Sequence, residues 1–252
     1  MEESFAVLNE AGLTIRGTIL RPKPRGKFPL VAIANGFFGI AASPVTKETS
    51  RLLLEAGFAV AVFDFTNGFG KSEGRASDIT MSQRARDISD VITYAKRRAY
   101  INEKKTYILG YGYGAMSALI LEAFHPIAHK LVLVNTPSTI QGASFMQFDS
   151  REMMRIKLKR YFHVHNGEKE ELINYTFFED GEKIDMPRCA RNLRTPTLFI
   201  AGEKDEVVSK EQSQWFVDRV PAEHEFLVLP GEHITGKKGV KAVVDAAVTF
   251  LK

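Results

Sequence analysis

Apolar residues along the chain occur in short runs, and amphipathic stretches separate these runs over most of the sequence. A continuous apolar run predicts a strand that is covered on both faces. Such runs lie at 28–35, 58–64, 107–111, 130–134, 196–202 and 224–230. Stretches with apolar residues at helical spacing lie between them, including 44–56, 80–94, 113–124 and 240–251. This alternation predicts right-handed βαβ units and a mostly parallel sheet.

The first twenty residues follow a different pattern. Two alternating segments, 5–9 and 13–20, flank a turn that contains Gly12 and predict an antiparallel hairpin. Together with the six buried runs, the hairpin predicts an eight-stranded sheet in an α/β fold. Three helix starts carry N-cap signals, which are Ser43 before Pro44, Thr80 with Gln83, and Ser209 with Gln212.

Residues 138–193 interrupt the alternation and predict an inserted cap. The expected domains are a first core part at 1–137, the cap at 138–193 and a second core part at 194–252. The cap contains a basic amphipathic stretch at 151–160, and Asp180-Gly181 predicts a two-residue hairpin turn. Its apolar side chains either shape a substrate pocket as a lid or serve as ordinary packing. The sequence leaves both interpretations open.

Composition limits the class of protein. The 252 residues are 44% hydrophobic and 25% charged, which is typical of a soluble globular chain. The single cysteine, Cys189, cannot form an internal disulfide, and no signal peptide or apolar run of about 18 residues is visible, so a cytoplasmic location is expected. The net charge of +4 is spread along the chain, so neither nucleic acid nor a membrane is an expected partner. His163 and His165 have a metal-ligand spacing without an evident third ligand, so no metal is expected.

The main candidate for chemistry is Gly110-Tyr111-Gly112-Tyr113-Gly114, between a predicted strand and a predicted helix. Its spacing is that of the nucleophile elbow G-x-S-x-G, in which the serine sits on a strained turn. Gly112 occupies the serine position. Glycine tolerates a positive φ better than any other residue. A glycine here should therefore preserve the fold while removing the attacking hydroxyl.

Two other interpretations fit the same residues. The letters also match G-x-G-x-x-A, a dinucleotide-binding fingerprint, which requires a carboxylate about 20 residues further on, at the end of the next strand. That strand ends at Asn135-Thr136 instead, and the motif lies in the middle of the chain. The other interpretation is a structural strand-to-helix turn without chemistry.

Further motifs occur in a fixed order around the elbow. They are the segments 35–39 (NGFFG), 64–74 (DFTNGFGKSEG), 202–208 (GEKDEVV) and 231–233 (GEH). In this order, and over nearly the whole chain, the sequence resembles the α/β-hydrolase superfamily. It is most similar to small cinnamoyl/feruloyl-esterase-like and acyl-peptidase-like serine carboxylesterases. Asn35 and Phe69 depart from the family pattern, which usually has histidine at both positions, and both changes are expected to affect only loop packing.

The resemblance implies acyl transfer and assigns a role to each motif. Gly112 stands at the nucleophile position, His233 is the implied general base, and Asp205 is the implied acid that orients it. The oxyanion is expected to bind the backbone N–H groups of Phe37 and Tyr113. The positive end of the helix that begins at Tyr113 would assist.

The expected partner is a small-molecule ester or acyl substrate, and no cofactor is implied. Phe38 and Tyr111 are expected to line an aromatic pocket, and homodimers are common in this class. Three interpretations of Gly112 remain. The chain is an esterase or thioesterase in which glycine has replaced serine, a ligand-binding protein on the same fold, or a lyase, cyclase or isomerase that uses His233 and Asp205 as a general base. Retention of both residues argues against the ligand-binding interpretation.

Overall fold

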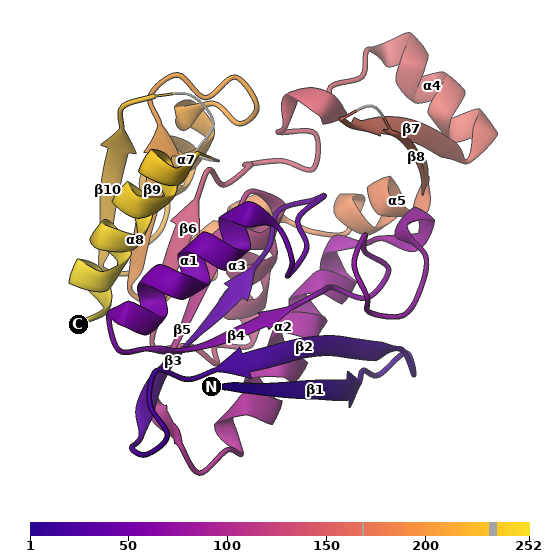
Figure 1. Cartoon of the computed structure of the whole chain (residues 1–252). Coiled ribbons are helices and arrows are strands. Elements are labelled where there is room, and N and C mark those ends of the chain that lie inside the picture. Colours follow the sequence, from indigo (N-terminus) through magenta and orange to yellow (C-terminus); the bar gives the residue numbers. More distant parts are fainter. Residues whose placement is uncertain (168, 232–235) are drawn as a thin grey trace.

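The computed structural model describes residues 1–167, 169–231 and 236–252. One large twisted sheet has the strand order β1-β2-β4-β3-β5-β6-β9-β10, and β7 and β8 form a separate pair (Figure 1). The strands are β1 (Glu2–Leu8), β2 (Thr14–Leu20), β3 (Phe28–Ala34), β4 (Ala59–Phe63), β5 (Ile101–Tyr111), β6 (Lys130–Val134), β7 (Tyr161–Asn166), β8 (Lys169–Asn174), β9 (Thr197–Gly202) and β10 (His224–Leu229).

The large sheet is mostly parallel. Strands β3, β4, β5, β6, β9 and β10 pair in parallel, whereas β1 pairs with β2 and β2 with β4 in the antiparallel sense. The predicted eight-stranded sheet and the opening hairpin are thus confirmed. Strand β5 begins at Ile101, whereas the apolar run predicts a start at Tyr107. The run missed the first half of the strand because that half is partly exposed.

Helices cover both faces of this sheet. The helices of the described chain are α1 (Pro44–Glu55), α2 (Met81–Lys96), α3 (Tyr113–Phe124), α4 (Ser150–Lys159), α5 (Thr176–Glu182), α6 (Met186–Asn192), α7 (Lys210–Val217) and α8 (Lys237–Leu251), with short 3-10 turns η1 (Ala76–Asp78) and η2 (Ser144–Met146). Figure 1 shows α1 beside α8 on one face and α2 with α3 on the other. Alternating residues of β3 divide accordingly, since Val31 and Ile33 pack in the α1–α8 core and Leu30, Ala32 and Ala34 in the α2–α3 core.

All three predicted N-cap residues occupy N-cap positions, and two of them form the cap hydrogen bond. The Ser43 hydroxyl accepts from the N–H of Thr46, and the Thr80 hydroxyl accepts from the N–H of Gln83. Ser209 occupies the N-cap position of α7 as predicted, but its side chain makes no cap hydrogen bond. Gln212 instead accepts from the N–H of Ser138 at 3.0 Å, so it ties α7 to the start of the predicted cap.

The interval 138–193 contains η2, the β7–β8 pair, α4, α5 and α6, and Figure 1 shows α4, β7 and β8 standing off from the large sheet. The predicted hairpin at Asp180-Gly181 is wrong, because both residues lie in α5. Close packing explains the glycine, since a Cβ at Gly181 would lie 2.4 Å from the side chain of Ile140. Within the described residues, no helix is both long and apolar enough to cross a membrane.

Candidate active site

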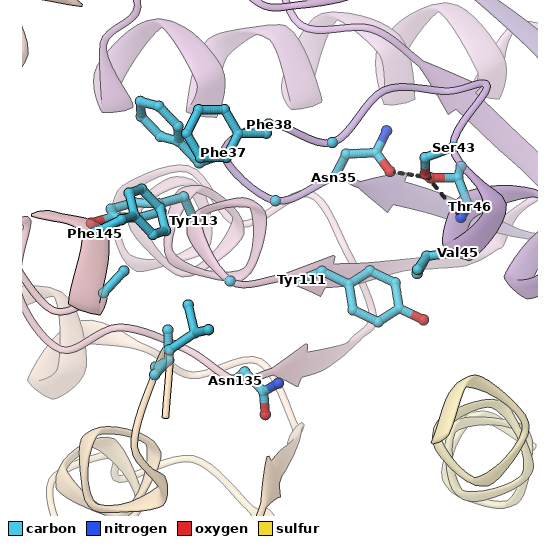
Figure 2. A pocket seen from close by; sticks show the side chains of 16 residues that line it. Asn35, Phe37, Phe38, Ser43, Val45, Thr46, Tyr111, Tyr113, Asn135 and Phe145 are labelled. Carbon is cyan, nitrogen blue, oxygen red and sulfur yellow. Dashed lines mark hydrogen bonds between the residues drawn. The ribbon is translucent and has the colours of Figure 1, made fainter. Parts of the chain in front are cut away.

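A pocket of about 310 Å³ lies at the carboxyl ends of β3, β5 and β6 (Figure 2). Chemistry in parallel α/β sheets gathers at this edge. The pocket lining includes five predicted site residues, which are Phe37, Phe38, Tyr111, Gly112 and Tyr113. It also includes residues that the motifs did not indicate, among them Val45, Thr46, Ala143 and Phe145. Phe145 could not be foreseen, because it reaches the pocket from η2, far along the chain.

The turn between β5 and α3 has the backbone of an elbow. Gly112 has φ +52° and ψ −119°, its N–H donates to Val134 O at 2.8 Å, and its carbonyl accepts from Met116 N at 3.0 Å. A Cβ built on Gly112 would meet no atom within 4 Å. A side chain at this position would therefore enter open space beside the pocket.

The two flanking glycines are constrained by packing instead. A Cβ at Gly110 would lie 2.6 Å from the Cα of Ala115, and a Cβ at Gly114 would lie 2.1 Å from the carbonyl oxygen of Ala34. Helix α3 thus approaches β3 and β5 so closely that only glycine fits at these two positions. Of the three, only Gly112 has room for a side chain.

The loop that follows β3 is held from two sides. The Asn35 carboxamide accepts from Thr46 Oγ1 at 2.5 Å and donates to Phe63 O at 3.2 Å. From the opposite side, Arg84 Nη2 donates to the carbonyls of Asn35 at 2.5 Å and Gly36 at 3.0 Å. Sequence reasoning missed Arg84, because an arginine in an amphipathic helix is usually exposed.

The predicted oxyanion donors are backbone N–H groups of this loop and of the first residue of α3. Within the described part of the chain, the N–H groups of Phe37 and Tyr113 donate to no other backbone or side-chain acceptor. Phe37 is 4% exposed, and its ring packs edge-on against Tyr113 at 5.4 Å and Phe38 at 5.0 Å between centroids. Both backbone donors therefore belong to residues whose side chains are fixed by packing.

Tyr111 and Tyr113 diverge from the elbow. Figure 2 shows Tyr111 lying toward Val45 and Tyr113 toward Phe145. The Tyr111 hydroxyl pairs with Thr49 Oγ1 at 2.8 Å, and that of Tyr113 donates to Ile140 O at 2.6 Å. Burial raises the pKa of Tyr111 to about 12 and also raises the pKa of Tyr113. Both phenols therefore remain protonated at neutral pH.

Asp205 lies in the loop between β9 and α7, next to the pocket. It is 6% exposed, and its Oδ1 accepts from the N–H groups of Val207 at 2.8 Å and Val208 at 2.9 Å. Both valines line the pocket. The carboxylate is thus fixed to the backbone that forms one wall. His233, the predicted base, lies outside the described residues.

Other polar residues brace the same edge. Asn135, at the end of β6, lines the pocket with φ +49° and accepts from the N–H of Gly202 at 3.1 Å. Asp64, at the end of β4, accepts from the N–H groups of Ala41 at 2.7 Å and Lys71 at 2.8 Å. These bonds tie β6 to β9, and the 64–74 loop to the segment that precedes α1.

The pocket is uncharged in the part that the structure describes. None of its 16 described lining residues is Asp, Glu, Lys, Arg or His. The described residues likewise hold no group of three or more His, Cys, Asp or Glu side chains suited to a metal ion. Transfer of a charged group into such surroundings without a partner is strongly unfavourable. The described lining therefore favours neutral, largely apolar ligands.

Residues 11–146, more than half of the chain, match the family described as X-Pro dipeptidyl-peptidase (S15 family). The chain belongs to this family. It is also 28% identical over 209 residues to the thiohydrolase apmlB of Arthrinium phaeospermum, with 78% of this chain and 66% of the relative covered. An uncharacterized 31.7 kDa protein of Escherichia coli is 30% identical over 93 residues, 37% of this chain and 32% of that protein. The chain thus spans from about one third to just under two thirds of these relatives.

Solved structures share the fold. Est1E of Butyrivibrio proteoclasticus, solved with bound ferulic acid, superposes with a TM-score of 0.82 at 20% identity, covering 98% of this chain and 99% of that one. The α/β-hydrolase GrgF of Penicillium superposes at 0.84 with 17% identity, covering 100% and 98%. DcsB, solved with a substrate analogue, gives 0.85 at 16% identity, covering 100% and 99%. The predicted α/β-hydrolase fold is confirmed.

Proposed function

We propose that the pocket is an acyl-transfer site for carboxylic esters or thioesters, in which Gly112 occupies the position of the nucleophile. The observation that carries this proposal is the contrast within the elbow. Packing requires glycine at 110 and 114, whereas the strained backbone at 112 faces open space where a serine side chain fits. Such a backbone is the hallmark of a nucleophile elbow.

The remaining groups have defined roles in this proposal. A serine at 112 would attack the ester carbonyl, and its proton would pass to His233 and then to the leaving group. Asp205 would stabilise the imidazolium. The N–H groups of Phe37 and Tyr113 would bind the oxyanion, and the N-terminus of α3 would add its positive end. With glycine at 112, the same pocket holds an ester without forming an acyl-enzyme.

The described lining supports one class of substrate over another. A dipeptidyl-peptidase removes dipeptides from a free N-terminus, whose ammonium group requires a negatively charged partner when it is buried. The described lining has no carboxylate, and Phe38 and Phe145 contribute aromatic surface. A neutral aromatic or acyl ester is therefore favoured over an N-terminal dipeptide. The similarity to a thiohydrolase and to an esterase that binds ferulic acid supports the same class.

The direct test is Gly112→Ser assayed with 4-nitrophenyl acetate and butyrate. Loss of a catalytic serine lowers kcat by about 10⁶-fold in a serine hydrolase, so the serine variant should exceed the parent chain by at least about 10³-fold. Gly112→Ala is the matched control, because it adds Cβ and the same backbone strain without a hydroxyl. A folded Gly112→Ser protein no faster than Gly112→Ala would overturn the proposal.

A second candidate function is general-base catalysis without a covalent intermediate, as in a lyase, cyclase or isomerase. The two N–H donors that hold Asp205 favour it, since the acid is still fixed beside a pocket that has no nucleophile. In that case the unsubstituted chain should turn over a substrate, and His233→Ala should abolish the turnover. Binding of an apolar ligand without any turnover, in both the parent and Gly112→Ser, would favour a ligand-binding protein.

A further inference from the structure

Arg84 is a charged residue in the core beneath the pocket. It lies on α2 with only 1% of its surface exposed, and its guanidinium carbon is 3.8 Å from the centroid of the Phe65 ring. Burial lowers the pKa of this guanidinium to about 9, so it remains charged at neutral pH. The charge of Asp87 on the same helix partly offsets the effect of burial, and among the described residues the Nε of Arg84 has no hydrogen-bond partner. The charge is therefore directed mainly to backbone carbonyls.

These carbonyls belong to the loop that carries a predicted oxyanion donor. Arg84 Nη2 donates to Asn35 O at 2.5 Å and to Gly36 O at 3.0 Å. The carbonyl of Gly36 and the N–H of Phe37 form a single peptide unit, and the described chain has no cis peptide bond. In a trans unit these two groups point in opposite directions. A guanidinium that holds the carbonyl on one side therefore turns the N–H toward the other.

The other side is the pocket. Gly36 and Phe37 line it, whereas Arg84 does not. A hydrogen bond to the carbonyl also polarises the amide, which strengthens the N–H as a donor, and the effect is larger in a medium of low dielectric constant. A buried positive charge near the pocket also favours negative charge that develops there.

We propose that Arg84 is a positioning residue that orients and polarises the Phe37 N–H for an anionic, tetrahedral acyl-transfer transition state. This inference rests on the proposed function. If the role of Arg84 were purely structural, replacing it would disorder the loop and weaken the binding of every ligand that touches Phe37 and Phe38. Loss of the proposed role should instead weaken only the binding of anionic tetrahedral ligands, since only these place a negative charge at the donors.

Binding to the unsubstituted chain separates these roles without requiring hydrolysis. The probes are methyl phenylphosphonate, a tetrahedral monoanion, and methyl benzoate, its planar neutral counterpart, both measured by isothermal titration calorimetry or ligand-observed NMR. Arg84→Met should weaken the phosphonate about tenfold, less than the 10²–10³-fold effect of losing an oxyanion donor. Methyl benzoate should change less than about twofold. The matched control is Arg86→Gln, which removes an exposed charge from the same helix and should change neither affinity.

If Arg84→Met does not fold, Arg84→Lys is the variant to measure. Lysine keeps the charge but lacks the planar fork, so the phosphonate should weaken about threefold with methyl benzoate unchanged. Equal losses for both probes, or no loss in either folded variant, would overturn the role of Arg84. If the parent chain binds neither probe and Gly112→Ser is also inactive, the proposed function fails instead. In the Gly112→Ser background, Arg84→Lys should lower kcat more than it raises KM.

Discussion

The three glycines of the turn between β5 and α3 are subject to different constraints. Gly110 and Gly114 lie where two backbones come within contact distance, so any Cβ would overlap another chain segment. Gly112 is constrained by its dihedral angles, because φ +52° is unfavourable for residues with a side chain. A single sequence cannot separate these two causes, since both appear as glycine.

The two constraints predict different costs. Gly112→Ala should destabilise the fold by about 1–2 kcal/mol, the usual penalty for a non-glycine residue in a strained region. Gly114→Ala should cost about 3 kcal/mol or more, because the carbonyl of Ala34 must move to admit a Cβ. Urea unfolding followed by circular dichroism would measure both. Equal midpoints for the two variants would contradict the packing argument for Gly114.

Much of the site was predictable at the level of single residues, and the failures have physical causes. Strand ends placed Asn35-Gly36, Gly112 and Asn135 on one edge, since parallel strands bring their carboxyl ends together. The family resemblance added Phe37, Tyr113 and Asp205. Arg84 was not predictable, because its partners lie almost fifty residues earlier in the chain. The roles of all these residues, and that of His233, remain predictions that the experiments above address.

Among the elements, the strands were easier to predict than the cap. Buried parallel strands are continuous apolar runs, which few other structures produce. In the cap, Asp180-Gly181 has the composition of a hairpin turn, yet the rings of Phe177 and Phe178 are buried and fix the segment as α5. Tertiary packing thus outweighs local turn chemistry there. The Asp180 carboxylate accepts from the N–H of Ser82 at 2.9 Å, so it caps α2 from a distant part of the chain.

Helix α2 also contains a group that should make stability depend on pH. Asp90 has a buried Oδ2 without a hydrogen-bond partner among the described residues. Burial, followed by the negative charges of Asp87 and Glu10, raises the pKa of Asp90 from 3.8 to about 6. Asp87 is fully buried and is fixed by hydrogen bonds from Asn9, Thr66 and Gln83, so it remains a close negative neighbour.

The sign of this effect is fixed by linkage. Because the pKa of Asp90 is higher in the folded than in the unfolded state, the folded chain binds more protons between about pH 4 and pH 6. Its contribution to stability is therefore lost as the pH rises through that range. Asp90→Asn should stabilise the fold at pH 7.5 by about 1 kcal/mol, a value reduced for solvent screening, and have little effect at pH 4.

Urea unfolding at the two pH values would measure this. Asp218→Asn removes a carboxylate from an exposed position at the end of α7 and is the matched control. Because Asp218 is exposed, its effect on stability should differ less between the two pH values than that of Asp90→Asn. A stabilisation by Asp90→Asn that is as large at pH 4 as at pH 7.5 would show that ionisation of Asp90 is not its cause.

On the scale of the whole molecule, an aromatic cluster joins the predicted cap to the sheet. Phe37, in the loop after β3, contacts Phe177 of α5 at 5.6 Å and Phe145 of η2 at 5.7 Å between ring centroids. The cluster continues into the β7–β8 pair, since Phe162 lies 6.2 Å from Phe177 and 4.8 Å from Phe178. The ring of Phe37, whose N–H is a proposed oxyanion donor, is thus packed directly against the cap.

This continuity predicts that the cap and the core unfold together. Hydrogen exchange of residues 107–111 and 130–134 reports on the core, and hydrogen exchange of residues 161–166 and 169–174 reports on the cap. In the parent chain the two unfolding free energies should agree. Phe177→Ala removes the ring between Phe37 and Phe162 at a cost of about 3–5 kcal/mol. The cap should then open at a lower free energy than the core.

Phe148→Ala is the matched control for this coupling. Phe148 contacts Phe162 and Phe178 within the cap but lies outside the ring contacts of Phe37, so its loss should lower stability without separating the two free energies. If Phe37 is held in place by the cap, ligands should also bind more weakly to Phe177→Ala than to Phe148→Ala at equal folded fractions. Separate transitions already present in the parent chain would show that the cap unfolds as an independent unit.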